Sequence, residues 1–101
     1  NILDEKYTNV KQIVIKPGES PSYQYHYKRS EIWVIVQGTA QVRLDDTTKV
    51  YGVGDVIQIP TLAKHQPKNI GDEDLIFVEI QLGEYFGEDD IVRLEDKYGR
   101  V

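Results

Sequence analysis

Hydrophobic and polar residues alternate along most of this chain, in short runs that predict β-strands. Residues 10–16, 22–27 and 40–44 place apolar or aromatic side chains at every second position, which is the period of a strand with one covered face. Residues 32–36 are β-branched or aromatic throughout, as expected of a buried strand. The first half of the chain is therefore predicted to form strands rather than helices.

Further short runs continue the same pattern toward the end of the chain. Residues 49–51 follow a predicted hairpin turn, residues 56–59 stop at Pro60, and residues 75–82 form the longest apolar strand. Seven or eight closely spaced strands predict an all-β sandwich or barrel. The tail differs, because apolar residues between 88 and 99 recur every three or four positions. We expect a short C-terminal helix there, with an irregular acidic strand as the alternative.

Length and composition narrow the class of protein. The 101 residues, 40% hydrophobic and 29% charged, predict one domain spanning residues 1–101. The longest apolar run, Ile32–Val36, is too short to cross a membrane, and no secretory leader opens the chain. Together with the absence of cysteine, this favours a cytoplasmic protein. The net charge of −5 argues against a nucleic-acid partner.

Both histidines of the chain fall where they could share one metal ion. Gln24 and His26 lie two residues apart on a predicted strand, so their side chains share a face. Glu31 opens the next strand after a tight turn at residues 28–30, and His65 comes from a distant hairpin. The predicted ligand set is therefore Gln24, His26, Glu31 and His65.

These nitrogen and oxygen donors suit Zn²⁺, Mn²⁺, Fe²⁺ or Ni²⁺, and the set suits a catalytic site better than a closed structural one. Taken singly, each residue has an ordinary explanation. A lone histidine on a strand is usually hydrogen-bonded to its surroundings, and a lone glutamate after a basic turn is usually solvated. The hypothesis depends on the combination.

The two stretches that contain these residues resemble the two motifs of the cupin superfamily. The first motif is matched at Gly18, Gln24, His26, Glu31 and Gly38, with Gln24 in place of a histidine. The second is matched at Gly54, Pro60, His65 and Asn69, with Leu62 in place of an inner glycine. The resemblance implies a double-stranded β-helix, also called a jelly-roll barrel.

A closer resemblance covers nearly the whole chain, from about Tyr7 to Arg100. The stretches 24–40, 78–85 and 88–100 are similar to type II mannose-6-phosphate isomerases, which form the C-terminal modules of bifunctional isomerase/mannose-1-phosphate guanylyltransferases. The resemblance implies a metal-dependent sugar-phosphate isomerase, with Zn²⁺ as the expected metal. Guanylyltransferase activity is not expected, because the nucleotidyltransferase half is absent.

The resemblance also suggests roles for residues outside the metal site. In converting mannose 6-phosphate to fructose 6-phosphate, Glu79 is a candidate base and Arg93 a candidate clamp for the phosphate or the enediolate. Lys64, next to His65, is a second candidate for phosphate binding. The ordinary alternatives are an outward-facing carboxylate for Glu79, an ion pair with nearby acids for Arg93, and solvation for Lys64. Lys28 and Arg29 are expected to be solvated in their turn.

Two other functions compete with the isomerase. Tyr27, Lys28 and Ile32 stand where the family tends to carry further histidines, which favours a non-catalytic or regulatory cupin that binds a sugar or metabolite. Two histidines and one carboxylate also describe a non-haem metal dioxygenase. For any of these we expect a homodimer, because a small β domain with open edges and many tyrosines has surface to cover.

Overall fold

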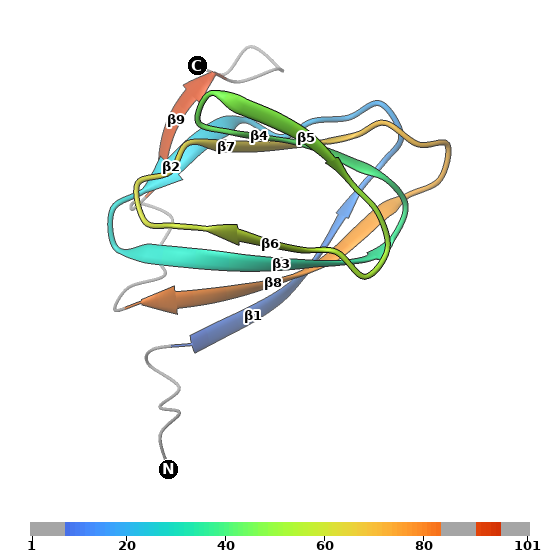
Figure 1. The fold of residues 1–101 in the computed structure, drawn as a ribbon. Coiled ribbons are helices and arrows are strands. Elements are labelled where there is room, and N and C mark those ends of the chain that lie inside the picture. Colours follow the sequence, from blue (N-terminus) through green and yellow to red (C-terminus); the bar gives the residue numbers. More distant parts are fainter. Residues whose placement is uncertain (1–7, 84–90, 96–101) are drawn as a thin grey trace.

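The computed structural model describes residues 8–83 and 91–95 of the chain. These residues form two antiparallel sheets stacked as two layers (Figure 1). The strands are β1 (Thr8–Ile15), β2 (Tyr23–His26), β3 (Arg29–Gln37), β4 (Ala40–Leu44), β5 (Thr47–Tyr51), β6 (Val56–Ile59), β7 (His65–Asn69), β8 (Leu75–Gly83) and β9 (Ile91–Glu95). The all-β prediction is confirmed.

Each sheet draws its strands from distant parts of the chain. One sheet has four strands in the order β1-β8-β3-β6, and the other has five in the order β5-β4-β7-β2-β9. Strand β3 lies beside β8 over nearly its whole length, and β1 flanks β8 on the other side. Residues far apart in sequence therefore meet between the layers, which is where a site can be assembled.

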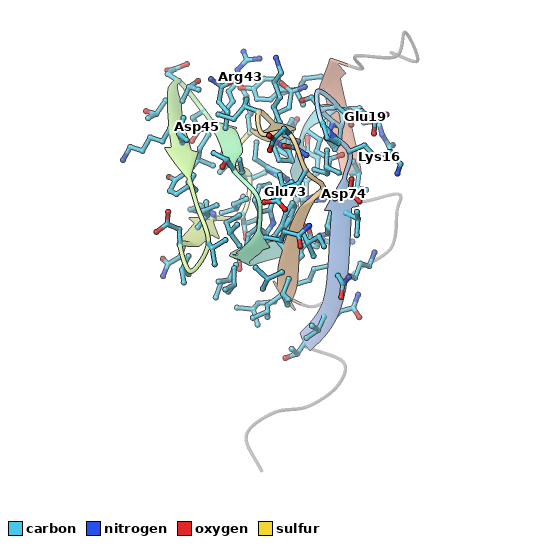
Figure 2. All side chains as sticks on the ribbon, turned by 90° about the vertical axis from the view of Figure 1, so that its right-hand side faces the viewer. Lys16, Glu19, Arg43, Asp45, Glu73 and Asp74 are labelled. Carbon is cyan, nitrogen blue, oxygen red and sulfur yellow. The ribbon has the colours of Figure 1, made fainter. Side chains whose placement is uncertain are left out.

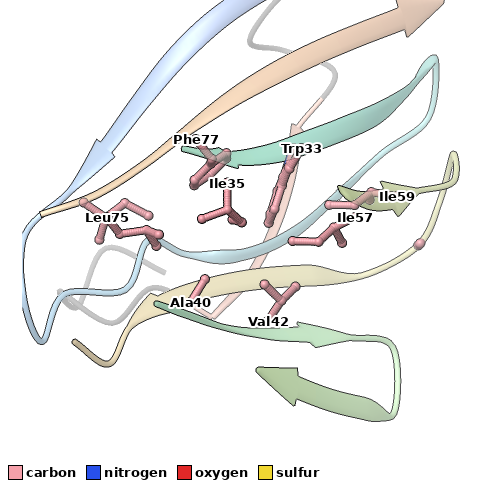
Figure 3. Close-up of a cluster of buried hydrophobic side chains, with 10 residues drawn as sticks. Trp33, Ile35, Ala40, Val42, Ile57, Ile59, Leu75 and Phe77 are labelled. Atoms are coloured by element: carbon pink, nitrogen blue, oxygen red, sulfur yellow. The ribbon is translucent and has the colours of Figure 1, made fainter. Parts of the chain in front are cut away.

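The core lies between the two sheets (Figure 3). Strands β3, β6 and β8 contribute most of it, because every second residue of each strand points inward. Ala40 and Val42 of β4 close the core from the opposite layer. The fully buried members include Ile35, Leu75 and Phe77. Trp33, expected to be a core residue, is 2% exposed and packs its ring 4.7 Å from that of Phe77.

Two strands differ from the sequence prediction in ways that matter for the site. Strand β3 begins at Arg29 rather than near residue 32, so the turn after β2 contains only Tyr27 and Lys28. Strand β7 was not predicted from the sequence, because it contains Pro67 among polar residues and such a composition does not favour a strand. It pairs with β4 along five residues but with β2 only at Gln24. The missing N–H of Pro67 agrees with that short second ladder.

The predicted C-terminal helix is wrong for the part of the tail that the structure describes. Residues 91–95 form β9, which pairs with β2 at the edge of the five-stranded sheet. The local spacing of apolar residues favoured a helix, but β2 offers an unpaired edge whose backbone groups need partners. The rest of the predicted helix, residues 88–90 and 96–99, lies outside the described residues.

Two turns have backbone conformations that restrict their sequence. Gly38, between β3 and β4, has a φ of +89°, and a Cβ there would lie 3.0 Å from the carbonyl oxygen of Asp74. Leu62, which replaces the motif glycine, has a φ of +72°, in the left-handed region that normally favours glycine. Its N–H donates to the carbonyl of His26 over 2.9 Å, which ties the turn before β7 to the end of β2.

Within residues 8–83 and 91–95 there is no helix long and apolar enough to cross a membrane. The cytoplasmic location stays a prediction.

Candidate metal centre

His26, Glu31 and His65 meet between the two sheets, each almost completely buried. His26 ends β2, Glu31 is the third residue of β3, and His65 begins β7. His26 Nε2 lies 3.2 Å from one carboxylate oxygen of Glu31, and His65 Nε2 lies 3.9 Å from the other. Donor atoms bound to one ion at about 2.0–2.2 Å lie roughly 3–4 Å apart. The three side chains therefore have the spacing of a metal-binding set.

The two imidazoles also have nitrogen atoms that nothing in the described part of the chain satisfies. Nδ1 of His65 donates to the carbonyl of Ala63 over 2.9 Å. In the neutral ring this leaves Nε2 with a lone pair directed at the site. His65 Nε2 and His26 Nδ1 are both buried without a hydrogen-bond partner among the described residues. Unpaired buried nitrogen is costly, so His65 Nε2, which lies beside Glu31, supports a metal at this position. His26 approaches Glu31 through Nε2 rather than through the unpaired Nδ1.

The charge states of Glu31 and His65 suit a divalent cation. Burial alone would raise the pKa of Glu31. The hydrogen bond with His26, the charge on His65 and the indole N–H of Trp33 outweigh burial and hold that pKa at about 2. Trp33 Nε1 donates to Glu31 Oε1 over 2.9 Å. Burial lowers the pKa of His65. An ionised carboxylate beside a neutral imidazole is the state that binds a metal ion.

Arg29 takes part in the site, although the sequence favoured a solvated turn residue. Its side chain is 4% exposed. Its Nε donates to Glu31 Oε2 over 3.0 Å, and its Nη2 lies 3.2 Å from His26 Nε2. The error follows from the predicted start of the strand. With β3 beginning at Arg29, period-two geometry places Arg29, Glu31 and Trp33 on the same inward face.

Gln24, the fourth predicted ligand, lies next to His65 on the neighbouring strand and lines the same cavity. Its Oε1 accepts a hydrogen bond from Ser22 over 3.3 Å. Its role as a metal ligand stays a prediction.

Glu79 faces inward on β8, in register with Trp33. It is 9% exposed. Its Oε2 accepts a hydrogen bond from Gln81 over 2.5 Å, and the amide oxygen of Gln81 accepts one from Asn9. Burial, and next the charge of Glu31, raise the pKa of Glu79. The outward-facing alternative is therefore wrong, whereas its role as a base stays a prediction.

A cavity of about 400 Å³ adjoins the metal-binding set. Gln24, Arg29, His65 and Glu79 lie in its wall, together with apolar residues of β1 and β8. Arg93 of β9 and Lys11 of β1 also line it, and both are exposed. Lys11 was not a candidate from the sequence, although its alternation with Ile13 and Ile15 placed it on the inner face.

Lys64 is exposed and does not belong to the residues that line this cavity. Its backbone N–H donates to Asp45 Oδ1 over 2.9 Å. Its predicted phosphate contact stays a prediction, without support from this placement.

The sequence of this chain matches, over residues 1–96, the family described as "Mannose-6-phosphate isomerase C-terminal". The chain belongs to this family. Solved structures with the same fold include double-stranded β-helix and cupin-barrel proteins. A conserved protein with a double-stranded β-helix domain from Klebsiella pneumoniae superposes with a TM-score of 0.80 at 20% identity, covering 94% of this chain and 81% of that one. The cupin fold is thereby confirmed.

Sequence relatives carry the name of a different enzyme. Mannose-1-phosphate guanylyltransferase ManC of Salmonella typhimurium is 46% identical over 96% of this chain and 20% of its own length. Alginate biosynthesis protein AlgA of Pseudomonas aeruginosa is 47% identical over 91% of this chain and 19% of its own length. The chain thus spans about a fifth of the curated relatives that it matches.

These names correct the function expected from the sequence. We expected an aldose–ketose isomerase acting on mannose 6-phosphate, but relatives at 46–47% identity are named guanylyltransferases, which are nucleotidyltransferases. The names give the non-haem dioxygenase no support either. The correction has a simple cause, since motifs within a barrel of this kind specify a fold and a metal site far better than a reaction. The relatives are enzymes of mannose metabolism, and the chain corresponds to one module of them.

Proposed function

We propose that this chain is the metal-binding cupin module of a mannose-1-phosphate guanylyltransferase, and that it binds a phosphorylated mannose beside its metal. The observation that carries the proposal is the convergence of His26, Glu31 and His65 beside a cavity whose rim carries Lys11 and Arg93. Guanylyl transfer itself is assigned to the large part of such a protein that the chain does not span.

We assign Zn²⁺ to the site, held by His26, Glu31 and His65, with the amide oxygen of Gln24 as a fourth ligand. Two imidazoles and a carboxylate without any thiolate are common ligands of zinc with an open position. A bound zinc ion would supply a localised positive charge able to interact with hydroxyl or phosphate oxygens. The protein contributes a buried carboxylate, Glu31, which is held by a hydrogen bond from the indole N–H of Trp33.

The ligand is inferred from the size and charge of the cavity. A volume of about 400 Å³ lies in the range of small-molecule sites. Lys11 and Arg93 offer cations to a phosphate, while Gln24 and Glu79 offer polar groups to sugar hydroxyls. The chain as a whole is acidic, so these two cations locally oppose its net charge. The names of the relatives identify mannose 1-phosphate as the ligand to test.

The first experiment measures metal content and ligand binding separately. The purified chain is dialysed against Zn²⁺, its metal is quantified by mass spectrometry, and mannose 1-phosphate, mannose and glucose 1-phosphate are titrated by calorimetry. We expect about one zinc ion per chain, and tighter binding of mannose 1-phosphate than of either control sugar. Absence of bound zinc would refute the metal site, whereas zinc without sugar-phosphate binding would refute only the ligand.

Three charge variants locate the phosphate. Lys11→Gln and Arg93→Gln should each weaken mannose 1-phosphate binding by about tenfold while leaving the zinc content unchanged. Lys64→Gln is the matched control and should bind like the parent chain, because Lys64 does not line the cavity. A loss confined to Lys64→Gln would place the phosphate at the second candidate that the sequence offered rather than at Arg93.

A further inference from the structure

The outer face of the four-stranded sheet is apolar and carries no charge. On β1, β8, β3 and β6, the residues between the inward-facing ones point away from the core. These outward positions are Thr8, Val10, Gln12, Val14, Ile76, Val78, Ile80, Leu82, Ser30, Ile32, Val34, Val36, Val56 and Gln58. None of these positions on the four described strands is charged, although 29% of the whole sequence is.

The strand registers place the apolar side chains of this face next to one another. Val10, Ile80 and Ile32 form one row across the sheet. Gln12, Val78, Val34 and Val56 form the next row. Val10, Val56 and Val14 are 60%, 56% and 50% exposed, so the described part of the chain leaves this face open. The polar members, Gln12 and Gln58, stand at opposite borders of an apolar centre.

Figure 1 shows the four strands of this sheet one after another in the lower part of the molecule, with the edge strand β1 lowest. Charged side chains lie elsewhere. Figure 2 shows Lys16 and Glu19 on the loop after β1, and Glu73 and Asp74 on the loop after β7. Arg43 and Asp45 belong to β4 and its turn, in the other sheet.

We propose that this face is a homodimer interface, at which two copies pack their four-stranded sheets against each other. The proposal names the surface through which the expected homodimer would form. It does not depend on the proposed function. Strands lie about 4.8 Å apart; three of the four are eight or nine residues long and β6 has four residues, which gives a face of roughly 450 Å². Two such faces bury about 900 Å², close to the roughly 1,000 Å² of the smallest specific interfaces.

A second copy suits this face better than a charged partner does. An interface around a two-fold axis uses the same patch twice, so the patch must complement itself. An uncharged face of mostly β-branched residues complements itself, because two copies of it can pack together without electrostatic repulsion. Two aligned sheets pack about 10 Å apart. Each copy carries a net charge of −5, which a neutral contact face keeps away from the interface. An exposed apolar patch of this size is often functional.

Light scattering coupled to size-exclusion chromatography tests the interface on the full 101-residue chain. At about 50 μM we expect twice the 11.6 kDa mass of one chain. The double variant Val10→Lys/Val56→Lys should run as a monomer, with its dimer dissociation constant raised at least a hundredfold. The matched control, Val50→Lys/Val53→Lys, adds the same charges at residues 58% and 68% exposed outside this face, and should remain a dimer.

Circular dichroism and thermal melting of all three proteins establish that each is folded. A monomeric parent chain at this concentration would overturn the proposal, and so would a Val10→Lys/Val56→Lys variant that is folded and still dimeric. Equal loss of the dimer in both double variants would also overturn it, since net charge rather than this face would then control association.

Discussion

Arg29 contacts two atoms that a metal ion at this centre would use. Its guanidinium contacts Glu31 Oε2 and lies 3.2 Å from His26 Nε2. It supplies a cation to Glu31 within a buried site, and it would repel a divalent ion only a few ångströms away. The same side chain therefore stabilises the metal-free centre and weakens metal binding. A metal that enters must displace the guanidinium from these contacts.

Arg29→Met should therefore bind Zn²⁺ more tightly than the parent chain. Removing a unit charge about 4 Å from the ion lowers the repulsion enough for a gain of about tenfold or more in affinity. Competition titration with a chromophoric chelator measures the change. Arg43→Met is the control, because Arg43 lies over the ring of Tyr23, 3.8 Å from its centroid, away from the centre. An unchanged or weaker affinity in a folded Arg29→Met variant would show that the guanidinium does not compete with the metal.

Glu79 is a second buried carboxyl close to Glu31, and its pKa is displaced in the opposite direction. Because folding raises this pKa, Glu79 favours the folded state fully only below the ordinary value of 4.5, and that contribution is lost as the pH rises through the raised pKa. Glu79→Gln removes the titration. The metal-free variant should consequently melt up to about 5 °C above the parent at pH 8, and the difference should shrink toward pH 4.5.

Differential scanning fluorimetry from pH 4.5 to 8 measures this effect. Glu73→Gln provides the control, since Glu73 is exposed on the loop after β7 and should melt like the parent at every pH. If Glu79→Gln lowered the melting temperature at pH 8, the carboxylate would be stabilising and the assigned sign would be wrong.

At the scale of elements, the strands that alternate strongly could be predicted and the others could not. Residues 75–82 and 40–44 were placed correctly because their inward residues repeat every second position. Strand β9 was only the alternative to a helix, because its partner, β2, lies more than sixty residues earlier in the sequence and no local pattern records such a pairing. Strand β7 was missed because Pro67 argues against a strand, although β4 supplies it with a complete ladder.

The same limits applied to the site. His26, Glu31 and His65 were predicted together because their spacing placed them on inward faces, and the structure brings all three together. Arg29 was missed because its strand was started too late. Lys11 was missed because only the cavity shows that the inner face of β1 reaches the site. The arrangement between distant strands decides such contacts, and a single sequence does not contain it.

Strands β3 and β8 approach so closely at Gly83 that a side chain has no room there. Gly83 stands opposite Arg29, and a Cβ would overlap the carbonyl oxygen of Lys28 and lie 2.9 Å from the Cα of Arg29. Gly83→Ala must therefore shift the start of β3, which carries Arg29 and Glu31. We expect a loss of about 1–3 kcal/mol in unfolding free energy, together with weaker zinc binding.

Chemical denaturation and metal titration of the same samples measure both effects. Gly52→Ala is the matched control, because a Cβ at Gly52 meets nothing within 4 Å. If Gly83→Ala lost stability but bound zinc normally, the start of β3 would not be coupled to the metal centre.

For the whole molecule, the metal centre joins the two sheets. Glu31 belongs to the four-stranded sheet, while His26 and His65 belong to the five-stranded one. An ion bound to all three would tie the layers together, and it would be lost on unfolding because the ligands come from distant parts of the chain. The stability of the fold should therefore depend on the metal.

We expect Zn²⁺ at a hundred times its dissociation constant to stabilise the chain by about 2.7 kcal/mol, which raises the melting temperature by roughly 10–20 °C for a chain of this size. His65→Gln should show almost no rise. The rise should be smaller at pH 4.5 than at neutral pH, because protons then compete with the metal for the His65 imidazole, although burial lowers its pKa, while Glu31, with its pKa at about 2, stays ionised. Scanning calorimetry with zinc and with a chelator at both pH values measures these differences. An equal rise in His65→Gln would mean that zinc stabilises the protein from another site, and the joining of the two sheets through this centre would have to be abandoned.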